Sequence, residues 1–307
     1  MKISIVTPTY NEALNIEDLY SQIKNEMLDI GCEYEHIIID NSSSDGTIEI
    51  IKKLAKNDKN LKVIINSKNF GHIKSPYYGL LQSNGDATIL MASDFQDPIY
   101  LIKEYVEKWK KGSQVVLGQK IKSKENKFLF LARKYFYKFL SNISDDNLTQ
   151  NTTGSGIFDK KIIIKLREIN DPYPYFRGLL AELSTEISTI KFEQPLRKKG
   201  KTKNNLFTLY DLAMLGIIKH SRKPLRFMTF LGFTISVLSF FTGIFYLFYK
   251  LLFWDTFSLG IAPLIIGIFF VSSVQIMLLG LVGEYIGVML LHQRNMPLVI
   301  EKERINF

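Results

Sequence analysis

Short apolar runs alternate with amphipathic stretches between residues 1 and 120. The runs are rich in isoleucine and valine, and in the stretches between them apolar residues recur every three or four positions, as on one face of a helix. Strands are predicted at 3–7, 36–40, 61–65, 88–91 and 115–117, and helices at 14–28, 47–57, 74–82 and 100–110. This alternation favours an α/β fold with a mostly parallel, Rossmann-like sheet.

Two long apolar runs, 227–249 and 256–283, follow near the C-terminus, and neither contains Asp, Glu, Lys or Arg. At ~1.5 Å per residue the first run would form a helix ~34 Å long, enough to cross the ~30 Å hydrocarbon core of a bilayer. Helices buried in a soluble core normally keep a polar stripe, so a pair of core helices is the weaker interpretation. The pattern predicts a two-helix transmembrane hairpin at 227–291.

The segments that flank this hairpin predict its orientation. Residues 204–226 combine the apolar spacing of an amphipathic interfacial helix with a basic linker, whereas the connector between the spans holds a single lysine. By the positive-inside rule, the first domain (1–203) and a short tail (292–307) are both cytoplasmic, as expected for a multi-pass protein of the inner (cytoplasmic) membrane. The N-terminus reads as a strand and turn and lacks a signal-peptide pattern.

The basic charge of the chain fits a membrane better than nucleic acid. The formal net charge is +9, but the basic residues crowd into 197–203 and 219–226, beside the first span. Anionic headgroups and phosphorylated ligands are therefore the expected partners. Cys32 is the only cysteine, which excludes an intramolecular disulfide and a cysteine-based zinc site.

Polar residues follow the first two predicted strands, as TPTYNE (7–12) and DNSSSDGT (40–47). Ligands of open α/β sheets bind at the carboxyl ends of the strands. A carboxylate there can accept hydrogen bonds from a base or ribose, and a serine-rich turn at a helix N-terminus can hold polar or anionic groups. Ordinary turn and cap chemistry is the alternative interpretation of residues 42–46.

Oxygen ligands are concentrated after the fourth predicted strand, where Asp94, Gln96 and Asp97 lie within four residues. Such a set suits Mg²⁺ or Mn²⁺, which shares phosphate oxygens with its substrate and could neutralise a pyrophosphate leaving group. For Asp97 the alternative is a capping role at a helix that begins at Pro98.

Nine segments together resemble the GT-A glycosyltransferases of family 2. Within them the chain is most similar to the polyisoprenyl-phosphate glycosyltransferases, namely dolichol-phosphate mannose synthases and bactoprenol glucosyltransferases. The segments occur in the same order and end in the same two-span anchor: TPTYNE, DNSSSDGT, NFGH (69–72), NGD (84–86), SDFQDP (93–98), PYFRGL (174–179), LRKKGKTK (196–203), KPLR (223–226) and GEYIG (283–287).

The resemblance implies a role for each matched residue. It assigns the nucleotide pocket to Pro8, Tyr10, Glu12 and Asp40, with Asp40 facing the base. It makes Asp94 and Gln96 the metal-binding pair. Arg177 and Arg197 would act with Asp94 in catalysis, near the donor pyrophosphate or the acceptor phosphate. The acceptor phosphate itself is assigned to Arg133, Arg197, Lys201 and Lys203.

Two positions depart from the family pattern. The acidic motif often reads Asp-Ala-Asp, yet Ala92 stands at its first acidic position, so metal binding would rely more on Gln96, water and the diphosphate. Gly154 stands where several members carry an acidic residue, which suggests a subgroup with a different donor or acceptor geometry.

The expected activity is inverting transfer of a sugar from a nucleotide-sugar to polyprenyl (undecaprenyl) phosphate. The resemblance makes UDP-glucose the default donor, and the lipid-linked sugar would serve cell-surface glycan modification. Related bactoprenol enzymes are tetrameric, which by analogy suggests a homo-tetramer. Three alternatives stay open: a catalytically idle membrane scaffold, a different lipid acceptor and a polysaccharide acceptor. A processive polysaccharide synthase is disfavoured because the chain lacks a Gln-x-x-Arg-Trp motif.

Overall fold

The computed structural model describes the chain except for residues 124–151, 184–185, 196–213, 220, 222 and 254–260. Its centre is an eight-stranded sheet with the strand order β7-β5-β6-β4-β1-β2-β3-β8. The strands are β1 (Lys2–Thr9), β2 (Glu33–Asp40), β3 (Leu61–Asn66), β4 (Ala87–Leu90), β5 (Val115–Ser123), β6 (Thr152–Asp159), β7 (Ile187–Gln194) and β8 (Glu301–Ile305).

Most neighbouring strands run parallel, as the sequence predicted. β1 pairs in parallel with β2 and β4, β2 with β3, and β5 with β7, whereas β6 and β8 run antiparallel to their neighbours. The predicted strands and helices before residue 120 are all present. β6, β7 and β8 were not predicted, and the antiparallel β6 and β8 give the sheet its mixed character.

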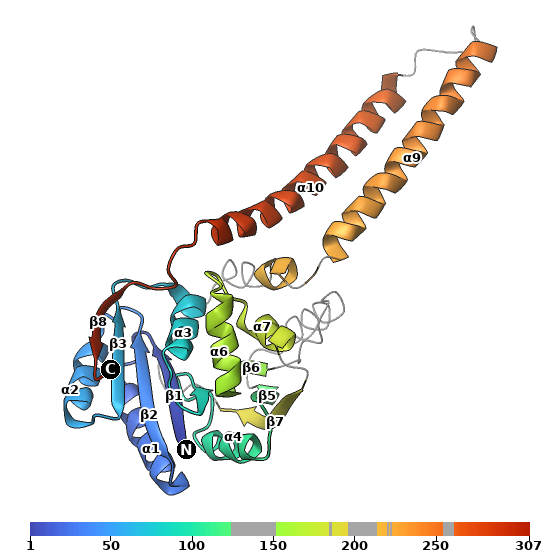
Figure 1. Cartoon of the computed structure of the whole chain (residues 1–307). Coiled ribbons are helices and arrows are strands. Elements are labelled where there is room, and N and C mark those ends of the chain that lie inside the picture. The colour runs from blue at the N-terminus through green and yellow to red at the C-terminus, as the bar shows by residue number, and fades with distance from the viewer. Residues whose placement is uncertain (124–151, 184–185, 196–213, 220, 222, 254–260) are drawn as a thin grey trace.

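Helices cover both faces of the sheet (Figure 1). One hydrophobic core joins the sheet to α1 (Ile16–Ile30), α2 (Thr47–Asn57) and α4 (Leu101–Lys110). A second core on the opposite face joins it to α3 (Gly71–Leu81), α6 (Lys160–Ile169) and α7 (Phe176–Leu183). Alternate strand residues supply the two cores, because successive side chains of a strand point to opposite faces. In β1, Ile5 faces the first core and Val6 faces the second.

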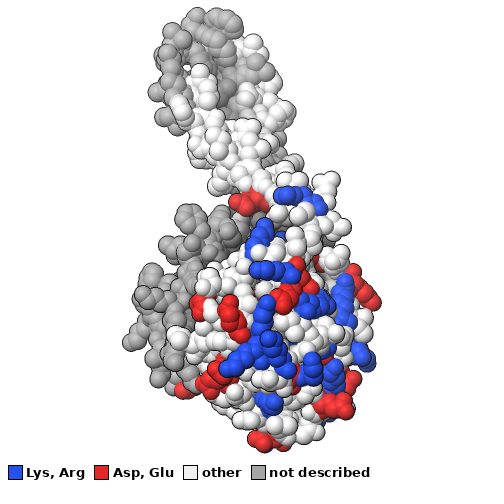
Figure 2. Space-filling model, turned by 90° about the vertical axis from the view of Figure 1, so that its left-hand side faces the viewer, with Lys and Arg blue, Asp and Glu red and all other residues white. Residues whose placement is uncertain are grey.

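Two long helices extend away from the sheet domain, α9 (Lys223–Leu252) and α10 (Ile261–Gln293) (Figure 1). In the described part of the chain both are long and apolar enough to cross a membrane, with candidate spans Lys223–Phe245 and Gly267–Gln293. α10 runs beyond the predicted end of the second span at residue 283 and so includes Glu284. Figure 2 shows charged residues on the sheet domain and around the base of the helices, above which the described helix surface is white.

The C-terminal segment returns to the sheet after these helices. β8 pairs with β3 and forms one edge of the sheet. The hydroxyl of Tyr78 in α3 donates to Glu301 (2.9 Å), and the amide of Asn306 donates to the carbonyl oxygen of Ala55 (2.7 Å). Residues 292–307, which the sequence analysis set apart as a tail, therefore contribute a strand to the N-terminal domain.

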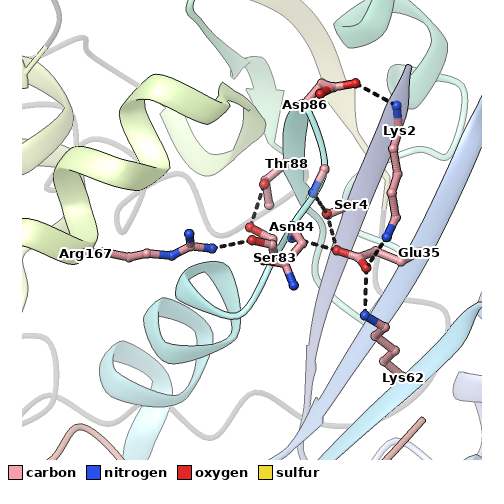
Figure 3. Close-up of polar contacts among 10 residues, drawn as sticks. Lys2, Ser4, Glu35, Lys62, Ser83, Asn84, Asp86, Thr88 and Arg167 are labelled. Carbon is pink, nitrogen blue, oxygen red and sulfur yellow. Dashed lines mark hydrogen bonds and ion pairs between the residues drawn. The ribbon is translucent and has the colours of Figure 1, made fainter. Parts of the chain in front are cut away.

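A buried carboxylate ties the amino ends of the central strands together (Figure 3). Glu35 of β2 accepts hydrogen bonds from Lys2 (2.8 Å), the Ser4 hydroxyl (2.6 Å), Lys62 (2.9 Å) and the backbone N–H of Asn84 (2.7 Å). Burial by itself would raise the pKa of Glu35, but these hydrogen bonds outweigh burial and lower the pKa to about 2. The cluster is at the end of the sheet opposite the carboxyl ends of the parallel strands.

The NGD segment belongs to this structural cluster. The backbone N–H of Gly85 donates to the Ser4 hydroxyl (2.8 Å), and Asp86 accepts from the backbone N–H of Lys2 (2.9 Å). A Cβ on Gly85 would lie only 2.7 Å from the backbone nitrogen of Ser4, so a larger residue does not fit there. From α6, Arg167 donates to the carbonyl oxygen of Ser83 on the other side of the turn (Figure 3). The motif thus joins β4 to β1 and α6.

Candidate functional site

The loops after β1 and β2 are locked to each other at the carboxyl edge of the sheet. The backbone N–H of Asn11 donates to the Ser43 hydroxyl (2.8 Å), and the Asn11 side chain accepts from the backbone N–H of Ser44 (2.8 Å). The backbone N–H of Glu12 donates to the Thr47 hydroxyl (3.0 Å). These contacts bring TPTYNE and DNSSSDGT together, as the parallel strand order predicts.

Asp40 is buried where these two loops meet. Its side chain is fully buried, and its two oxygens accept from the backbone N–H (2.8 Å) and the hydroxyl (2.5 Å) of Ser43. Burial raises the pKa of Asp40, and the hydrogen bonds from Ser43 oppose that rise. Because each carboxylate oxygen can accept more than one hydrogen bond, Asp40 retains capacity for a donor group of a ligand.

The NFGH loop is held by a single amide. Asn41 accepts from the backbone N–H of Phe70 (2.9 Å) and from the side chain of Asn66 (3.1 Å), and it donates to Asn69 (2.8 Å) and to the carbonyl oxygen of Gly71 (3.1 Å). The Asn41 side chain thus uses its whole hydrogen-bonding capacity. These bonds fix the loop that follows β3 beside the loop that follows β2.

The turn after β4 carries the predicted metal ligands. Phe95 has a positive φ of 58°, which is a strained backbone conformation for a bulky residue. Its side chain is buried in the first core and keeps the turn in place. The backbone N–H of Gln96 donates to Asp94 (3.2 Å), so the Asp94 side chain is held against the backbone of the turn.

Gln96 and Asp97 present oxygens that suit a hard cation. The side-chain oxygen of Gln96 accepts one hydrogen bond, from Gln194 (3.1 Å), and a carbonyl oxygen has a second lone pair. Asp97 is 4% exposed, and its Oδ1 atom has no hydrogen-bond partner among the described residues. Burial raises the pKa of Asp97 to about 6; Lys120 opposes the rise, and Asp94 adds to it. Asp94, Gln96 and Asp97 therefore fit a divalent cation as oxygen donors.

The capping interpretation of Asp97 is wrong, because α4 begins at Leu101, beyond the reach of a side-chain cap at position 97.

Other buried hydrogen-bond acceptors without a partner also lie at this edge of the sheet. In the described residues they include Thr9 Oγ1 at the end of β1 and Asn66 Oδ1 at the end of β3, besides Asp97 Oδ1. Buried polar atoms in proteins are nearly always hydrogen-bonded, so such a concentration indicates a place for a polar ligand, ion or water.

The family model described as glycosyl transferase family 2 matches residues 4–167, more than half of the chain. The chain belongs to glycosyl transferase family 2. A Bacillus subtilis glycosyltransferase, YkcC, is 32% identical to it over 98% of this chain and 93% of the relative. The bactoprenol glucosyl transferase of Shigella phage SfII is 29% identical over 99% of this chain and 98% of the relative.

A solved structure shows the fold of this family 2 glycosyltransferase. Glucosyl-3-phosphoglycerate synthase from Mycobacterium tuberculosis covers 71% of this chain and 77% of its own with a TM-score of 0.51 at 17% identity. The mostly parallel mixed sheet is therefore a GT-A fold, and the prediction of a GT-A glycosyltransferase of family 2 is confirmed.

The structure brings several of the predicted site residues of the glycosyltransferase to one edge. Asp40 ends β2, and Pro8 is one residue before the end of the neighbouring parallel strand β1, opposite Ile39 in the register; Tyr10 directly follows β1. Glu12 is buried where α1 approaches, and its carboxylate accepts from Asn15 (2.6 Å). Four further predicted residues, Arg133, Arg197, Lys201 and Lys203, lie outside the described residues. The nucleotide, metal and acceptor roles themselves stay predictions.

Arg177 is near the unusual glycine of this glycosyltransferase. Gly154 has a φ of 84°, and a Cβ built on it would lie 3.9 Å from Arg177 Nε. An acidic residue at position 154, as in several family members, would therefore face the Arg177 guanidinium. These two motif positions are thus neighbours in space, although they are on β6 and α7.

A second polar cluster ties the enzyme domain to the long helices. Asp171, in the loop before α7, accepts from Lys219 (2.7 and 2.6 Å) in the segment before α9. His292, at the end of α10, lies 3.5 Å from the same carboxylate. Asp171 is 5% exposed, so the pair with Lys219 is buried. Sequence reasoning missed Asp171 because no pattern marks an aspartate whose partners are about 48 and 121 residues away.

Proposed function

We propose that this glycosyltransferase transfers a sugar from a nucleotide-sugar to polyprenyl phosphate at the cytoplasmic face of the inner membrane. UDP-glucose is the default donor and undecaprenyl phosphate the default acceptor. The names of the bactoprenol glucosyl transferases that match almost the whole chain support this acceptor. The product would be a lipid-linked sugar for modification of cell-surface glycans.

The concentration of unpartnered buried acceptors at the carboxyl edge carries the proposal. Thr9 Oγ1, Asn66 Oδ1 and Asp97 Oδ1 are at or after the carboxyl ends of β1, β3 and β4, the edge of the sheet where the family's nucleotide site is expected. This edge also faces the long helices, because the backbone N–H of Ser67, just after β3, donates to the carbonyl oxygen of Ile300 (2.9 Å), shortly after α10. A donor bound there would be close to a membrane that holds α9 and α10.

The chemistry requires positioning more than proton transfer. A lipid phosphate has a second pKa of about 6 and is therefore anionic at neutral pH, so it needs no general base. One of its oxygens forms a bond to the anomeric carbon while the bond from that carbon to the donor diphosphate breaks, and the nucleoside diphosphate leaves. This single displacement inverts the anomeric configuration. The protein must orient two anionic reactants and offset their repulsion.

Asp94 and Gln96 would hold a divalent cation at the donor diphosphate, with Asp97 behind them. When bound, Mg²⁺ or Mn²⁺ supplies charge neutralisation of the leaving diphosphate. A complex of the M. tuberculosis synthase with Mn²⁺ and UDP agrees with this proposal. Asp40 would accept from the base, and Pro8, Tyr10 and Glu12 would complete the nucleotide pocket. We assign the acceptor phosphate to Arg133, Arg197, Lys201 and Lys203, and a catalytic role to Arg177 and Arg197 together with Asp94.

The return of β8 to the sheet supports a hairpin in the membrane. The sheet contains strands that precede α9 and a strand that follows α10, so both ends of the helical pair are on the same side. If α9 crosses the bilayer, α10 must cross back. The basic residues that precede α9 favour the cytoplasm for that side. A homo-tetramer remains our proposal by analogy.

A transfer assay with the purified full chain tests this function. The protein is incubated with a short polyprenyl phosphate, Mg²⁺ or Mn²⁺, and radiolabelled UDP-glucose, UDP-galactose, UDP-N-acetylglucosamine or GDP-mannose. We expect lipid-linked product with one donor. Asp94→Asn should lower the rate by roughly a hundredfold or more, in the range seen when one electrostatic contact to a transition state is lost. Asp29→Asn, which neutralises an exposed aspartate of α1, is the control.

The other outcomes separate the alternatives. Donor binding without product from any donor would favour the idle scaffold. Product on a polysaccharide or another lipid, but not on polyprenyl phosphate, would identify a different acceptor. Full activity of Asp94→Asn in the presence of a chelator would contradict the assignment of the cation.

A further inference from the structure

Three side chains form a hydrogen-bonded row at the carboxyl edge. Lys120 Nζ donates to Gln194 Oε1 (2.7 Å), and Gln194 Nε2 donates to Gln96 Oε1 (3.1 Å). Gln194 is 6% exposed, so its two hydrogen bonds are shielded from water. Neither Lys120 nor Gln194 is among the predicted site residues. The row nevertheless ends at the Gln96 side-chain oxygen, the atom that is expected to bind the cation.

The sheet explains why these residues meet. In the parallel pairing of β5 with β7, Lys120 is opposite Phe192, and Gln194 follows Phe192 by two residues. Residues two apart on a strand share a face, so Lys120, Phe192 and Gln194 all point to the side covered by α4. Phe192 is buried in the core on that side. A register shift just after Lys120 interrupts the pairing, which resumes with Lys122 opposite Glu193, and such bulges are common next to active sites.

Lys120 determines which atoms of the row donate hydrogen bonds and which atoms accept them. An ammonium group donates hydrogen bonds and accepts none, so the Gln194 atom that faces it must be the oxygen. The nitrogen of Gln194 then faces Gln96, and the Gln96 atom that receives its proton must also be the oxygen. An amide can turn over by 180° and exchange its oxygen and nitrogen, but here that would place two donors against each other.

Lys120 also acts electrostatically on the metal-binding turn. Its positive charge opposes the rise in the pKa of Asp97, the buried carboxylate next to Gln96 in the sequence. The row therefore begins at a cation and ends at Gln96 in that turn. Such outer contacts commonly orient the ligands of a metal and tune its affinity.

We propose that Lys120 and Gln194 are positioning residues that fix the Gln96 amide with its oxygen turned toward the divalent cation. The remaining lone pair of that oxygen is then presented to the metal. In a chain with alanine at position 92, the metal site has lost one carboxylate, and a fixed amide oxygen becomes correspondingly important. This inference rests on the proposed function, because it requires a cation at the donor diphosphate.

Mn²⁺ binding in the presence of saturating UDP tests the role of the row without turnover. Free Mn²⁺ is measured by electron paramagnetic resonance during titration of the full chain. Gln194→Met keeps the length of the side chain and removes both hydrogen bonds, and we expect it to weaken Mn²⁺ binding roughly threefold to tenfold. Lys120→Met should act in the same direction, and Lys120→Arg, which also only donates, should restore most of the affinity. Gln114→Met, at an exposed glutamine just before β5, is the control.

A double-mutant cycle identifies Gln96 as the target of the row. In a Gln96→Met background, Gln194→Met should have no further effect on Mn²⁺ binding. In the transfer assay, Gln194→Met should raise the Mn²⁺ concentration needed for half-maximal rate while the rate at saturating Mn²⁺ stays near that of the wild type. A general structural defect would lower the rate at every Mn²⁺ concentration.

Three results would overturn the proposal. The first is equal Mn²⁺ affinity of the wild type and Gln194→Met, and the second is an undiminished effect of Gln194→Met in the Gln96→Met background. The third is loss of UDP binding without metal in Lys120→Met alone, which would make Lys120 a direct contact of the nucleotide. A failure of the cation assignment itself is distinguishable, because the wild type would then bind no Mn²⁺ with UDP.

Discussion

Glu35 offers the most quantitative prediction for this enzyme. Its side chain is 2% exposed and is paired with both Lys2 and Lys62. Its pKa falls from the ordinary value of 4.5 to about 2 in the folded protein, which corresponds to about 3 kcal/mol of stabilisation of the folded state. Glu35→Gln keeps the shape of the side chain but leaves two lysines without their counter-charge. We expect the free energy of unfolding at pH 7 to fall by about that amount.

The pH dependence follows from the direction of the shift. A carboxyl whose pKa is lowered by folding stabilises the protein fully above its unfolded pKa, and this stabilisation is lost as the pH falls toward the folded pKa. The difference between the wild type and Glu35→Gln should therefore be constant above about pH 5 and shrink to about 1 kcal/mol at pH 3. Lowering the pH should thus destabilise the wild type more than the variant.

Thermal unfolding of the full chain in detergent measures this effect. At ~2–4 °C per kcal/mol, the melting temperature of Glu35→Gln should be ~6–12 °C below that of the wild type at pH 7. Glu33→Gln changes the net charge equally at an exposed position of the same strand and should shift the melting temperature very little. Equal melting temperatures for the two variants at pH 7 would refute the reasoning, and so would a difference that grows as the pH falls.

Two further predictions concern the connection between the enzyme domain and the helices. Asp171→Asn should leave UDP binding unchanged but reduce transfer to polyprenyl phosphate severalfold, because it leaves buried Lys219 without its counter-charge beside α7. Weakened UDP binding in a donor titration would contradict this local role. A reporter fused after Phe307 should be active only as a cytoplasmic fusion, and one inserted at 254–260 should report the opposite side; the reverse pattern would disprove the orientation.

Local sequence patterns were sufficient for the first half of the sheet. β1 to β4 are short apolar runs with helices between them, and their ladders are formed mainly by neighbours in the chain. The same regularity predicted that Asp40 and the Asp94 turn would lie at the same edge of the sheet, since parallel strands share their carboxyl ends. The family resemblance then added chemical roles that no spacing could supply.

The second half of the sheet could not be predicted, because its residues interact with partners that are distant in sequence. β8 reads as a charged tail, EKERI, and becomes a strand only because β3 offers an open edge more than 200 residues earlier. Gln194 carries no signal of its own, since its importance depends on a lysine 74 residues away and on an amide 98 residues away. The alternative interpretation of Asp97 as a helix cap failed because the turn continues to Leu101 before the helix begins.

If α9 and α10 span a membrane, the return of the chain to the sheet determines where the proposed site lies relative to it. The sheet would hold its place beside a bilayer loosely if it were attached through α9 alone. It is attached twice, because the chain re-enters the sheet at β8 next to β3, and the end of β3 is where Ser67 is bonded to Ile300. Asp171 adds a third tie, since it contacts Lys219 before α9 and His292 at the end of α10. These ties all lie toward the carboxyl ends of the strands, where Asp40 and Asp94 are found. In the proposed function the acceptor phosphate stays at the membrane surface, so the donor edge must be held close to it. A double attachment at that edge would meet this requirement.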